Sequence, residues 1–346
     1  MAHNIMERDN LFTVRKPAWH GLGQVLPQHP SREEAKAIAH PWEPQSEPVY
    51  RRVTAPVQHW HHLQCPDGCD QETELVTTHE EVNDFQGIAR SDTGDLLGVV
   101  PSTYEVVSNE TLYDIAEAIQ GEGAEVLFET GGSLKNGRKV WLLLRFEEPL
   151  RLGGRHGTET IPYYALQNSH DGTGAFRGQA TMTAIVCDNT AQMADLDAKA
   201  RGTEFVFRHT KNVGERIEEA KVALAGWRES VETFNRMADF LINTPITAKH
   251  RQLFVEEFIP MPQQTMISER VRNNIEEGRR RLNSIFDSPT QESVKDTAYG
   301  LVQASVEYHQ WYRRARSEES RFQRAYLDRS RFTADAVALA QEVASF

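Results

Sequence analysis

The chain lacks the features that mark secreted, membrane-spanning and nucleotide-binding proteins. Its 346 residues include three cysteines, too few for a disulfide framework and typical of a reducing compartment. No apolar run approaches the ~18 residues of a membrane span, and the N-terminal MAHNIMERDN has no apolar signal-peptide core. The glycine-rich motifs of dinucleotide and phosphate binding do not occur between a strand and a helix. We therefore expect a cytoplasmic protein with no membrane partner and no cofactor.

Positive charge is also in deficit. The sequence has 38 Lys and Arg against 50 Asp and Glu, a net charge of −12. This excludes a uniformly basic nucleic-acid binder but not a local basic groove, because the sum hides the distribution. At about 150 residues per domain, the length indicates roughly two domains.

The first two thirds of the chain show the spacing of short antiparallel strands. Runs of β-branched and apolar residues between turns predict strands at 85–90, 96–100, 125–130, 139–146 and 181–186. Asn136-Gly137 is a strong hairpin signal, because glycine accepts the positive φ of a type I′ turn. Pro41, Pro44 and Pro48 favour an extended path into residues 49–57.

Apolar residues at helical spacing predict helices at 31–39, 108–120 and 190–200 among the strands. Helices dominate the last third, where they are predicted at 212–242, 247–258, 265–286, 291–316 and 333–344. Ser31 and Glu34 have the spacing of a capping box. We expect an α+β fold, an antiparallel β-meander and hairpin sheet with packed helices followed by a C-terminal helical subdomain. The expected parts are an N-terminal arm and short helix (1–57), an α+β core domain (58–211) and a helical subdomain (212–346).

Two polar clusters flank the strand predicted at 181–186. The first contains Asn168, Ser169, His170 and Asp171, and the second contains Cys187, Asp188 and Asn189. The simpler interpretation is a turn followed by a helix N-cap. The alternatives are an anion bound at the helix N-terminus, or acid/base chemistry by His170, Asp171, Cys187 and Asp188 in a shared cleft.

Other residues carry hypotheses of the same kind. Trp19 and His20 either pin an N-terminal arm to the core or line a base-stacking site. Five metal-ligand residues occur close together, His59, His61, His62, Cys65 and Cys69. They lack a second paired knuckle, so we favour a hairpin loop without metal and leave zinc open. The arginine-rich helix at 265–286 is interpreted as a surface helix with mixed ion pairs.

Basic residues in the β-rich part are the candidates for nucleic-acid contact. They are Lys135, Arg138, Lys139, Arg177, Arg201, Arg208 and Lys211. Charged hairpin tips are commonly only solvated. If these side chains converge in the fold, however, they can neutralise the phosphates of a single strand and make its binding depend on salt.

Several motifs occur in an order that resembles a known family. They are Trp19-His20-Gly21-Leu22-Gly23, Arg90-Ser91-Asp92-Thr93, Leu97-Gly98-Val99-Val100, Asn168-Ser169-His170-Asp171-Gly172, Val186-Cys187-Asp188-Asn189-Thr190, Ala298-Tyr299-Gly300 and Glu307-Tyr308. Together they resemble the phage/plasmid-like protein family, domain of unknown function 932. The resemblance implies a setting of bacteriophages, prophages and plasmids, and it supplies no catalytic residues. The order of elements is also similar to the core of phage single-strand annealing recombinases.

The sequence therefore favours one function and leaves two others open. We expect a phage- or plasmid-encoded DNA-metabolism protein that binds single-stranded DNA and promotes strand annealing or recombination, as a homo-oligomer in the bacterial host cytoplasm. One alternative is a non-catalytic structural or host-interaction protein of a mobile element. The other is an enzyme that processes nucleic acids or nucleotides, for which the sequence offers no nucleophile–base motif.

Overall fold

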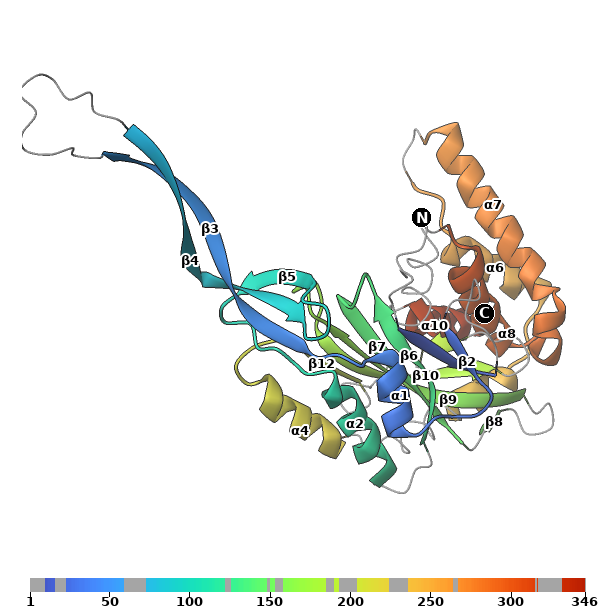
Figure 1. Ribbon diagram of the computed structural model, residues 1–346. Coiled ribbons are helices and arrows are strands. Elements are labelled where there is room, and N and C mark those ends of the chain that lie inside the picture. The colour runs from blue at the N-terminus through green and yellow to red at the C-terminus, as the bar shows by residue number, and fades with distance from the viewer. Residues whose placement is uncertain are drawn as a thin grey trace, which may run out of the picture.

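The fold is α+β, as the sequence predicts, with two sheets and a C-terminal group of helices (Figure 1). A computed structural model describes residues 10–15, 23–58, 73–121, 126–147, 150–152, 158–184, 190–192, 204–223, 236–263, 267–314, 316 and 332–345. Within these residues the larger sheet has the strand order β11-β10-β9-β7-β6-β1-β2, with β12 paired to β10 and β8 paired to β9.

The larger sheet is almost entirely antiparallel. Its strands are β1 (Leu11–Val14), β2 (Gln24–Leu26), β6 (Val126–Leu134), β7 (Lys139–Phe146), β8 (Leu150–Leu152), β9 (Thr158–Ser169), β10 (Phe176–Ala184), β11 (Thr190–Gln192) and β12 (Glu204–Phe207). Only β1 and β2 run parallel among the pairs described. The central strand predicted at 139–146 is confirmed as β7, which lies between β6 and β9.

One face of this sheet carries the core. Leu142 pairs with Leu166, and Leu166 with Gly178, so all three lie on the same face. The helices on this side are α1 (Arg32–Ala39), α2 (Glu110–Gly121) and α4 (Val213–Ala223). The helices predicted at 31–39 and 108–120 are confirmed, and α1 begins at the predicted capping box of Ser31 and Glu34.

A three-stranded sheet lies against one end of the larger sheet. It consists of β3 (Pro44–Gln58), β4 (Thr73–Arg90) and β5 (Leu96–Pro101) in the order β3-β4-β5. A Cβ on Gly98 of β5 would lie 2.8 Å from Cα of Asp171, which shows how closely the two sheets approach. Beyond β5, residues 50–58 and 73–81 form a two-stranded ribbon that projects away from the body (Figure 1). We call this ribbon the arm.

The C-terminal helices gather away from α1, α2 and α4 (Figure 1). They are α6 (Ala248–Phe258), α7 (Glu269–Phe286), the 3-10 turn η3 (Pro289–Val294), α8 (Ala298–Glu307), the π-helical turn η4 (Tyr308–Tyr312) and α10 (Phe332–Ala344). Every residue of α8 is buried, and α10 packs on α8 and α6. The helices predicted at 247–258, 265–286 and 333–344 correspond to α6, α7 and α10.

Two helix predictions are wrong. Thr190 begins the short strand β11 instead of a helix, and the pair Thr183–Thr190 joins two β-branched residues that suit a sheet. The helix predicted at 291–316 is divided, because Asp296 has a φ of 61° and Thr297 caps a new helix with its side chain. The prediction at 212–242 is helical at 213–223 and 236–242, and the residues between lie outside the described part.

The hairpin predicted at Asn136-Gly137 is confirmed. Lys135, Asn136 and Gly137 have φ values of 56°, 60° and 94°, so the turn requires the left-handed region that glycine occupies freely. A Cβ on Gly137 would also lie 2.6 Å from Cζ2 of the buried Trp42. The turn is therefore closely packed as well as tight.

We expect Gly137→Ala to destabilise the fold more than Gly94→Ala. Both residues have positive φ, but a Cβ on Gly94 meets nothing within 4 Å. Gly94→Ala should cost about 1–2 kcal/mol through backbone strain alone. Gly137→Ala should cost roughly 1–3 kcal/mol more through the clash with Trp42. Urea unfolding of the two variants measures the difference, and equal losses would show that Trp42 moves aside freely.

Candidate functional site

The first candidate is the polar cluster around His170, which lies at the junction of the two sheets and α2. The side chain of His170 is fully buried, and its Nε2 lies 2.9 Å from Oδ1 of Asn109. Because an amide oxygen only accepts, Nε2 carries the proton and donates it. Asn109 donates from Nδ2 to the backbone oxygen of Trp42 at 2.8 Å, and His170 donates its backbone N–H to Arg138 at 2.8 Å.

A carboxylate from another segment caps α2 at this junction. Oε2 of Glu43 accepts hydrogen bonds from the backbone N–H of Asn109 at 2.7 Å and from the hydroxyl of Ser108 at 2.9 Å. Negative charge at a helix N-terminus is stabilising, because the free N–H groups and the helix dipole are positive there. Lys36 lies 3.3 Å from the other oxygen of Glu43 and also binds Glu110.

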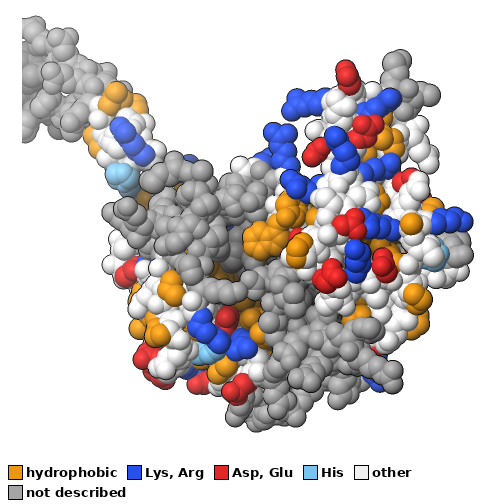
Figure 2. All heavy atoms as spheres, turned by 90° about the vertical axis from the view of Figure 1, so that its right-hand side faces the viewer, with side chains coloured by type: hydrophobic (Ala, Val, Ile, Leu, Met, Phe, Trp, Pro, Cys, Tyr) orange, Lys and Arg blue, Asp and Glu red, His pale blue; other side chains and the backbone are white. Residues whose placement is uncertain are grey.

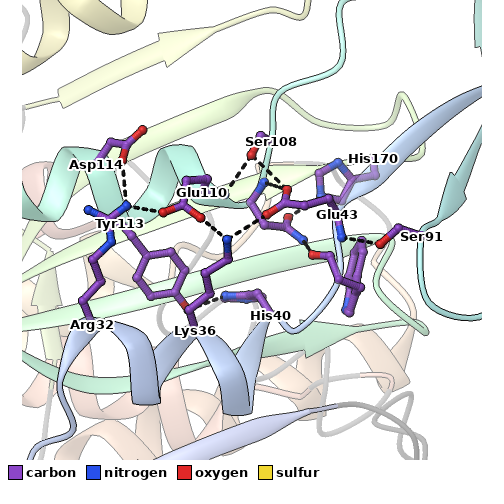
Figure 3. Close-up of polar contacts among 12 residues, drawn as sticks. Arg32, Lys36, His40, Glu43, Ser91, Ser108, Glu110, Tyr113, Asp114 and His170 are labelled. Carbon is purple, nitrogen blue, oxygen red and sulfur yellow. Dashed lines mark hydrogen bonds and ion pairs between the residues drawn. The ribbon is translucent and has the colours of Figure 1, made fainter.

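Ion pairs continue this network between α1 and α2 (Figure 3). Arg32 on α1 binds Asp114 at 2.8 Å and also contacts Glu110 and Glu117 on α2. Behind them, His40 Nδ1 accepts from the Tyr113 hydroxyl at 2.8 Å. The network fixes the position of α1 against α2. The charged side chains of the network are therefore paired with each other within the fold.

The motif that begins at Arg90 has a structural role as well. Arg90 is 4% exposed, and its guanidinium lies 4.5 Å from the ring centre of Trp42. It donates two hydrogen bonds, of 2.9 and 2.8 Å, to the carboxylate of Asp92. This pairing is the main reason that the pKa of Asp92 lies below its usual value. Ser91 accepts the backbone N–H of Glu43 at 2.9 Å, which joins this turn to the Glu43 cap.

The chemistry of His170 is that of a neutral internal ring. Burial, together with the nearby His209 and His40, lowers its pKa to about 3, although Asp171 acts in the opposite direction. Asp171 is bound elsewhere, because its Oδ1 accepts from Ser169 Oγ at 2.7 Å and Thr173 Oγ1 at 2.6 Å. His170 and Asp171 therefore do not form an acid/base pair, and Cys187 and Asp188 lie outside the described residues.

The second candidate is the basic end of the larger sheet. Lys135 and Arg138 lie in the β6–β7 turn, Lys139 begins β7, and Arg208 and Lys211 follow β12. Since β12 pairs with β10, β10 with β9, and β9 with β7, these segments end at the same side of the sheet. The structure thus brings together candidates that are up to 76 residues apart in the sequence, from Lys135 to Lys211.

Arg177 belongs to the same surface. Lys139 pairs with Ser169 and Arg177 with Gln167, so both basic residues lie on the sheet face opposite Leu166. Within the described chain, no carboxylate lies within the 4.0 Å of an ion pair from Arg138, Lys139, Arg177, Arg208 or Lys211. We call these five residues and Lys135 the basic sheet end. Arg201 lies outside the described residues.

The arginines of α7 are used differently. Arg279 donates to the backbone oxygens of Ile259 and Glu256, Arg280 pairs with Glu277, and Arg281 lies over the ring of Tyr312. Figure 2 shows Lys and Arg side chains interspersed with Asp and Glu on this side of the molecule. A groove of about 330 Å³ lies between α6 and α7. Arg251 in this groove is bound to Asp287 at 2.6 Å, and Arg279 is bound to the backbone oxygens named above. Neither arginine that lines the groove is therefore free to bind an anion.

Several sequence hypotheses concern residues that the structure leaves out. Trp19, His20, Asp188, Asn189 and the residues from His59 to Cys69 lie outside the described ranges. Among the residues that are described, no group of three or more His, Cys, Asp and Glu side chains could hold a metal ion. In the same part of the chain, no helix is both long enough and apolar enough to cross a bilayer.

Little in the sequence marks the residues that hold the junction together. Asn168 and His170 belong to a sequence motif, whereas Asn109 only lies within the segment predicted as a helix at 108–120. Trp42 and Glu43 stand in a proline-rich stretch with no periodicity to mark them. Their importance comes from contacts with segments about 48 to 128 residues away, such as Trp42 with Arg90 and with His170, and local patterns do not encode such contacts.

We expect the buried ring of His170 to make stability depend on pH. The unfolded ring takes up a proton near its usual pKa of 6.5, whereas the folded ring does so only at about 3. Between these values the unfolded state binds more protons, so stability falls as the pH falls from 6.5. In His170→Gln, whose amide can still donate to Asn109, the slope of unfolding free energy should be smaller by up to about 1.4 kcal/mol per pH unit.

Urea titrations from pH 7 down to pH 5 measure this slope. The wild type and His170→Gln should differ by a constant amount near pH 7 and converge as the pH falls. Parallel curves over the whole range would contradict the neutral, buried state of His170 in the folded protein.

Comparison with known proteins gives a family and no function. No curated protein and no solved structure matches the chain. A family model described as a domain of unknown function, DUF932, matches residues 96–330, which include β5, the basic sheet end and most of the C-terminal helices. The chain belongs to the DUF932 family.

Proposed function

We propose that this protein binds single-stranded nucleic acid at the basic sheet end. The observation that carries the proposal is the convergence of positive side chains from separate segments on one side of the larger sheet. Among the described residues, five of them have no carboxylate within ion-pair distance, namely Arg138, Lys139, Arg177, Arg208 and Lys211. Arg138, Arg208 and Lys211 are exposed, and Lys139 and Arg177 are half-buried. Such a surface neutralises phosphates and releases their counterions.

The spacing of the strands suits an extended ligand. Lys139 starts β7, and Arg208 follows β12, which is three strand positions away across β9 and β10. At about 4.8 Å between neighbouring strands, the cations span roughly 15 Å. This length matches a short stretch of nucleic-acid backbone better than a single phosphate group.

The neighbouring helices favour a single strand over a duplex. Proteins that read double-stranded DNA commonly place a helix in the major groove. The helices on the core side carry acidic side chains instead, with Glu110, Asp114 and Glu117 on α2 and Glu215 and Glu218 on α4. The α2 carboxylates are held by Arg32 and Lys36, so this helix presents no basic face to a major groove. The basic surface therefore belongs to the sheet and to its turns.

A role in strand annealing extends this proposal. A sheet that holds the phosphates leaves the bases free to pair with a complementary strand. The phage or plasmid setting and the annealing activity rest on the resemblance of motifs and element order. The contact between phosphates and the basic sheet end is tested independently of them.

We expect Arg138→Ala/Lys211→Ala to weaken the binding of a labelled single-stranded oligonucleotide by roughly tenfold or more in low salt. Each lost phosphate contact should also reduce the slope of log K against log salt by about 0.7. Both side chains are exposed and have no described partner, so their removal should not affect folding. Gel shifts or fluorescence anisotropy at several salt concentrations measure both effects.

Arg270→Ala/Arg272→Ala is the matched control. It removes the same total charge from exposed positions on α7, outside the basic sheet end. This variant should bind like the wild type. Equal weakening in both variants would show only a general effect of charge, and the absence of wild-type binding below the micromolar range in low salt would end the proposal.

A further inference from the structure

In the part of the chain that the structure describes, the arm pairs only between its own two strands. Side chains at positions 50–56 and 75–81 are exposed, except for the half-buried Val53 and Val76. Tyr50 and Leu75 are 54% and 69% exposed. A two-stranded ribbon without further packing is marginally stable in water. Its two outer edges also present unpaired backbone N–H and C=O groups.

The outer edge of β3 is interrupted by prolines, of which Pro56 lies in the arm. β3 contains Pro44, Pro48 and Pro56. They are separated by even numbers of residues. Proline has no N–H, and in a sheet it is tolerated where that N–H would point away from the neighbouring strand. The prolines therefore interrupt the row of outward donors on β3, a common protection against strand addition.

The outer edge of β4 is open. Its arm segment, residues 73–81, contains no proline. Pro56 pairs with Leu75 and cannot donate to it, so this must be a pair without hydrogen bonds, and the N–H of Leu75 points outward. By alternation, the N–H groups of Thr77, His79 and Glu81 also point outward. At the other end, Arg90, which pairs with Pro44, directs its N–H away from β3 to Asp95, as the same rule requires.

We propose that the open edge of β4 pairs with β4 of a second copy of this chain. The two strands run antiparallel about a two-fold axis and join the arms into a four-stranded ribbon in the order β3-β4-β4-β3. A contact of this isologous kind closes on itself. It satisfies the outward N–H groups of β4, while Pro56 interrupts the row of donors on the outer edge of β3.

Charge favours an axis at Thr78 over the neighbouring axis at Thr77, among the registers that the outward N–H groups allow. With the axis at Thr78, Thr77 exchanges hydrogen bonds with His79 of the other copy, and Glu80 lies opposite Val76. A shift of the axis to Thr77 would instead place Glu80 opposite Glu74. Like charges directly opposite each other destabilise a sheet. The arm is close to charge balance, with Arg51 and Arg52 against Glu74, Glu80 and Glu81, which suits a copy of itself better than a polyanion.

The first test compares two proline variants of the full-length chain. Thr77→Pro removes an outward N–H from β4, whereas Thr54→Pro removes one from the already interrupted edge of β3. Thr54 and Thr77 are paired, and their hydroxyls lie 3.1 Å apart. Both variants therefore lose the same side-chain hydrogen bond and gain one proline at the same level of the arm.

Sedimentation equilibrium gives the mass of each variant. The wild type and Thr54→Pro should reach twice 39.3 kDa, and Thr77→Pro should fall to the mass of one chain with an unchanged melting temperature of the body. Dissociation of both variants to the same extent would overturn the proposal, because pairing would then not depend on the β4 edge. A wild-type protein that stays at 39.3 kDa, with or without an oligonucleotide, would also overturn it and leave the edge to a different partner.

The second test fixes the register by cross-linking. In a chain whose three natural cysteines are replaced by serine, Thr78→Cys places two thiols across the two-fold axis. Residues of a non-hydrogen-bonded antiparallel pair have Cα atoms about 4.5 Å apart, within the range that a disulfide spans. Oxidation should give a covalent dimer. Val53→Cys, on the neighbouring strand opposite Thr78, should not cross-link, and equal cross-linking of both variants would contradict the register.

Discussion

The side chain of Asn109 connects three segments that are far apart in the sequence, and the junction of the two sheets depends on it. Its amide nitrogen donates to Trp42, its amide oxygen accepts from His170, and its backbone N–H donates to Glu43. Each group is buried or half-buried, so the loss of one partner would leave another polar atom unsatisfied away from water. The loop before α2, the turn after β9 and the start of β3 are therefore held together by complementary polar groups as well as by apolar contact.

This junction explains why family motifs that look catalytic have a structural role here. His170 binds Asn109, Asn168 binds the backbone oxygen of Val107 at 3.1 Å, and Arg90 lies against Trp42. A neutral, buried imidazole whose proton is already donated is poorly suited to proton transfer with a ligand. Among the described residues, Arg138, Arg208 and Lys211 of the basic sheet end are exposed instead.

The sequence predicted the elements whose signals are local. The capping box of Ser31 and Glu34, the turn at Asn136-Gly137 and the helix capped by Thr247 need only neighbouring residues to specify them. The division of the helix predicted at 291–316 was missed, because the left-handed conformation of Asp296 is stabilised by a distant contact, the hydrogen bond from Ile246 to its backbone oxygen.

The candidate site follows the same division between local and distant information. Lys135, Arg138 and Lys139 are close in the sequence, so the basic turn was predictable from it. Their proximity to Arg208 and Lys211 depends on β12 pairing with β10, and no local pattern encodes that pairing. The length of β4 was missed for a similar reason. Among the described residues, its arm segment pairs only with β3, so the alternation of buried and exposed residues that marks a strand is absent there.

The basic sheet end and the arm, to which the two proposals refer, both adjoin β5. A Cβ on Gly172, in the turn between β9 and β10, would lie 2.9 Å from Val100, and Gly98 lies equally close to Asp171. The small sheet therefore packs closely beside the basic sheet end, and the arm continues outward from it. Pairing of two arms would place two basic surfaces in one complex, one at each end of the four-stranded ribbon. A protein that holds one strand at each surface brings two strands into the same complex, and this raises their effective concentration for pairing without any contact to the bases.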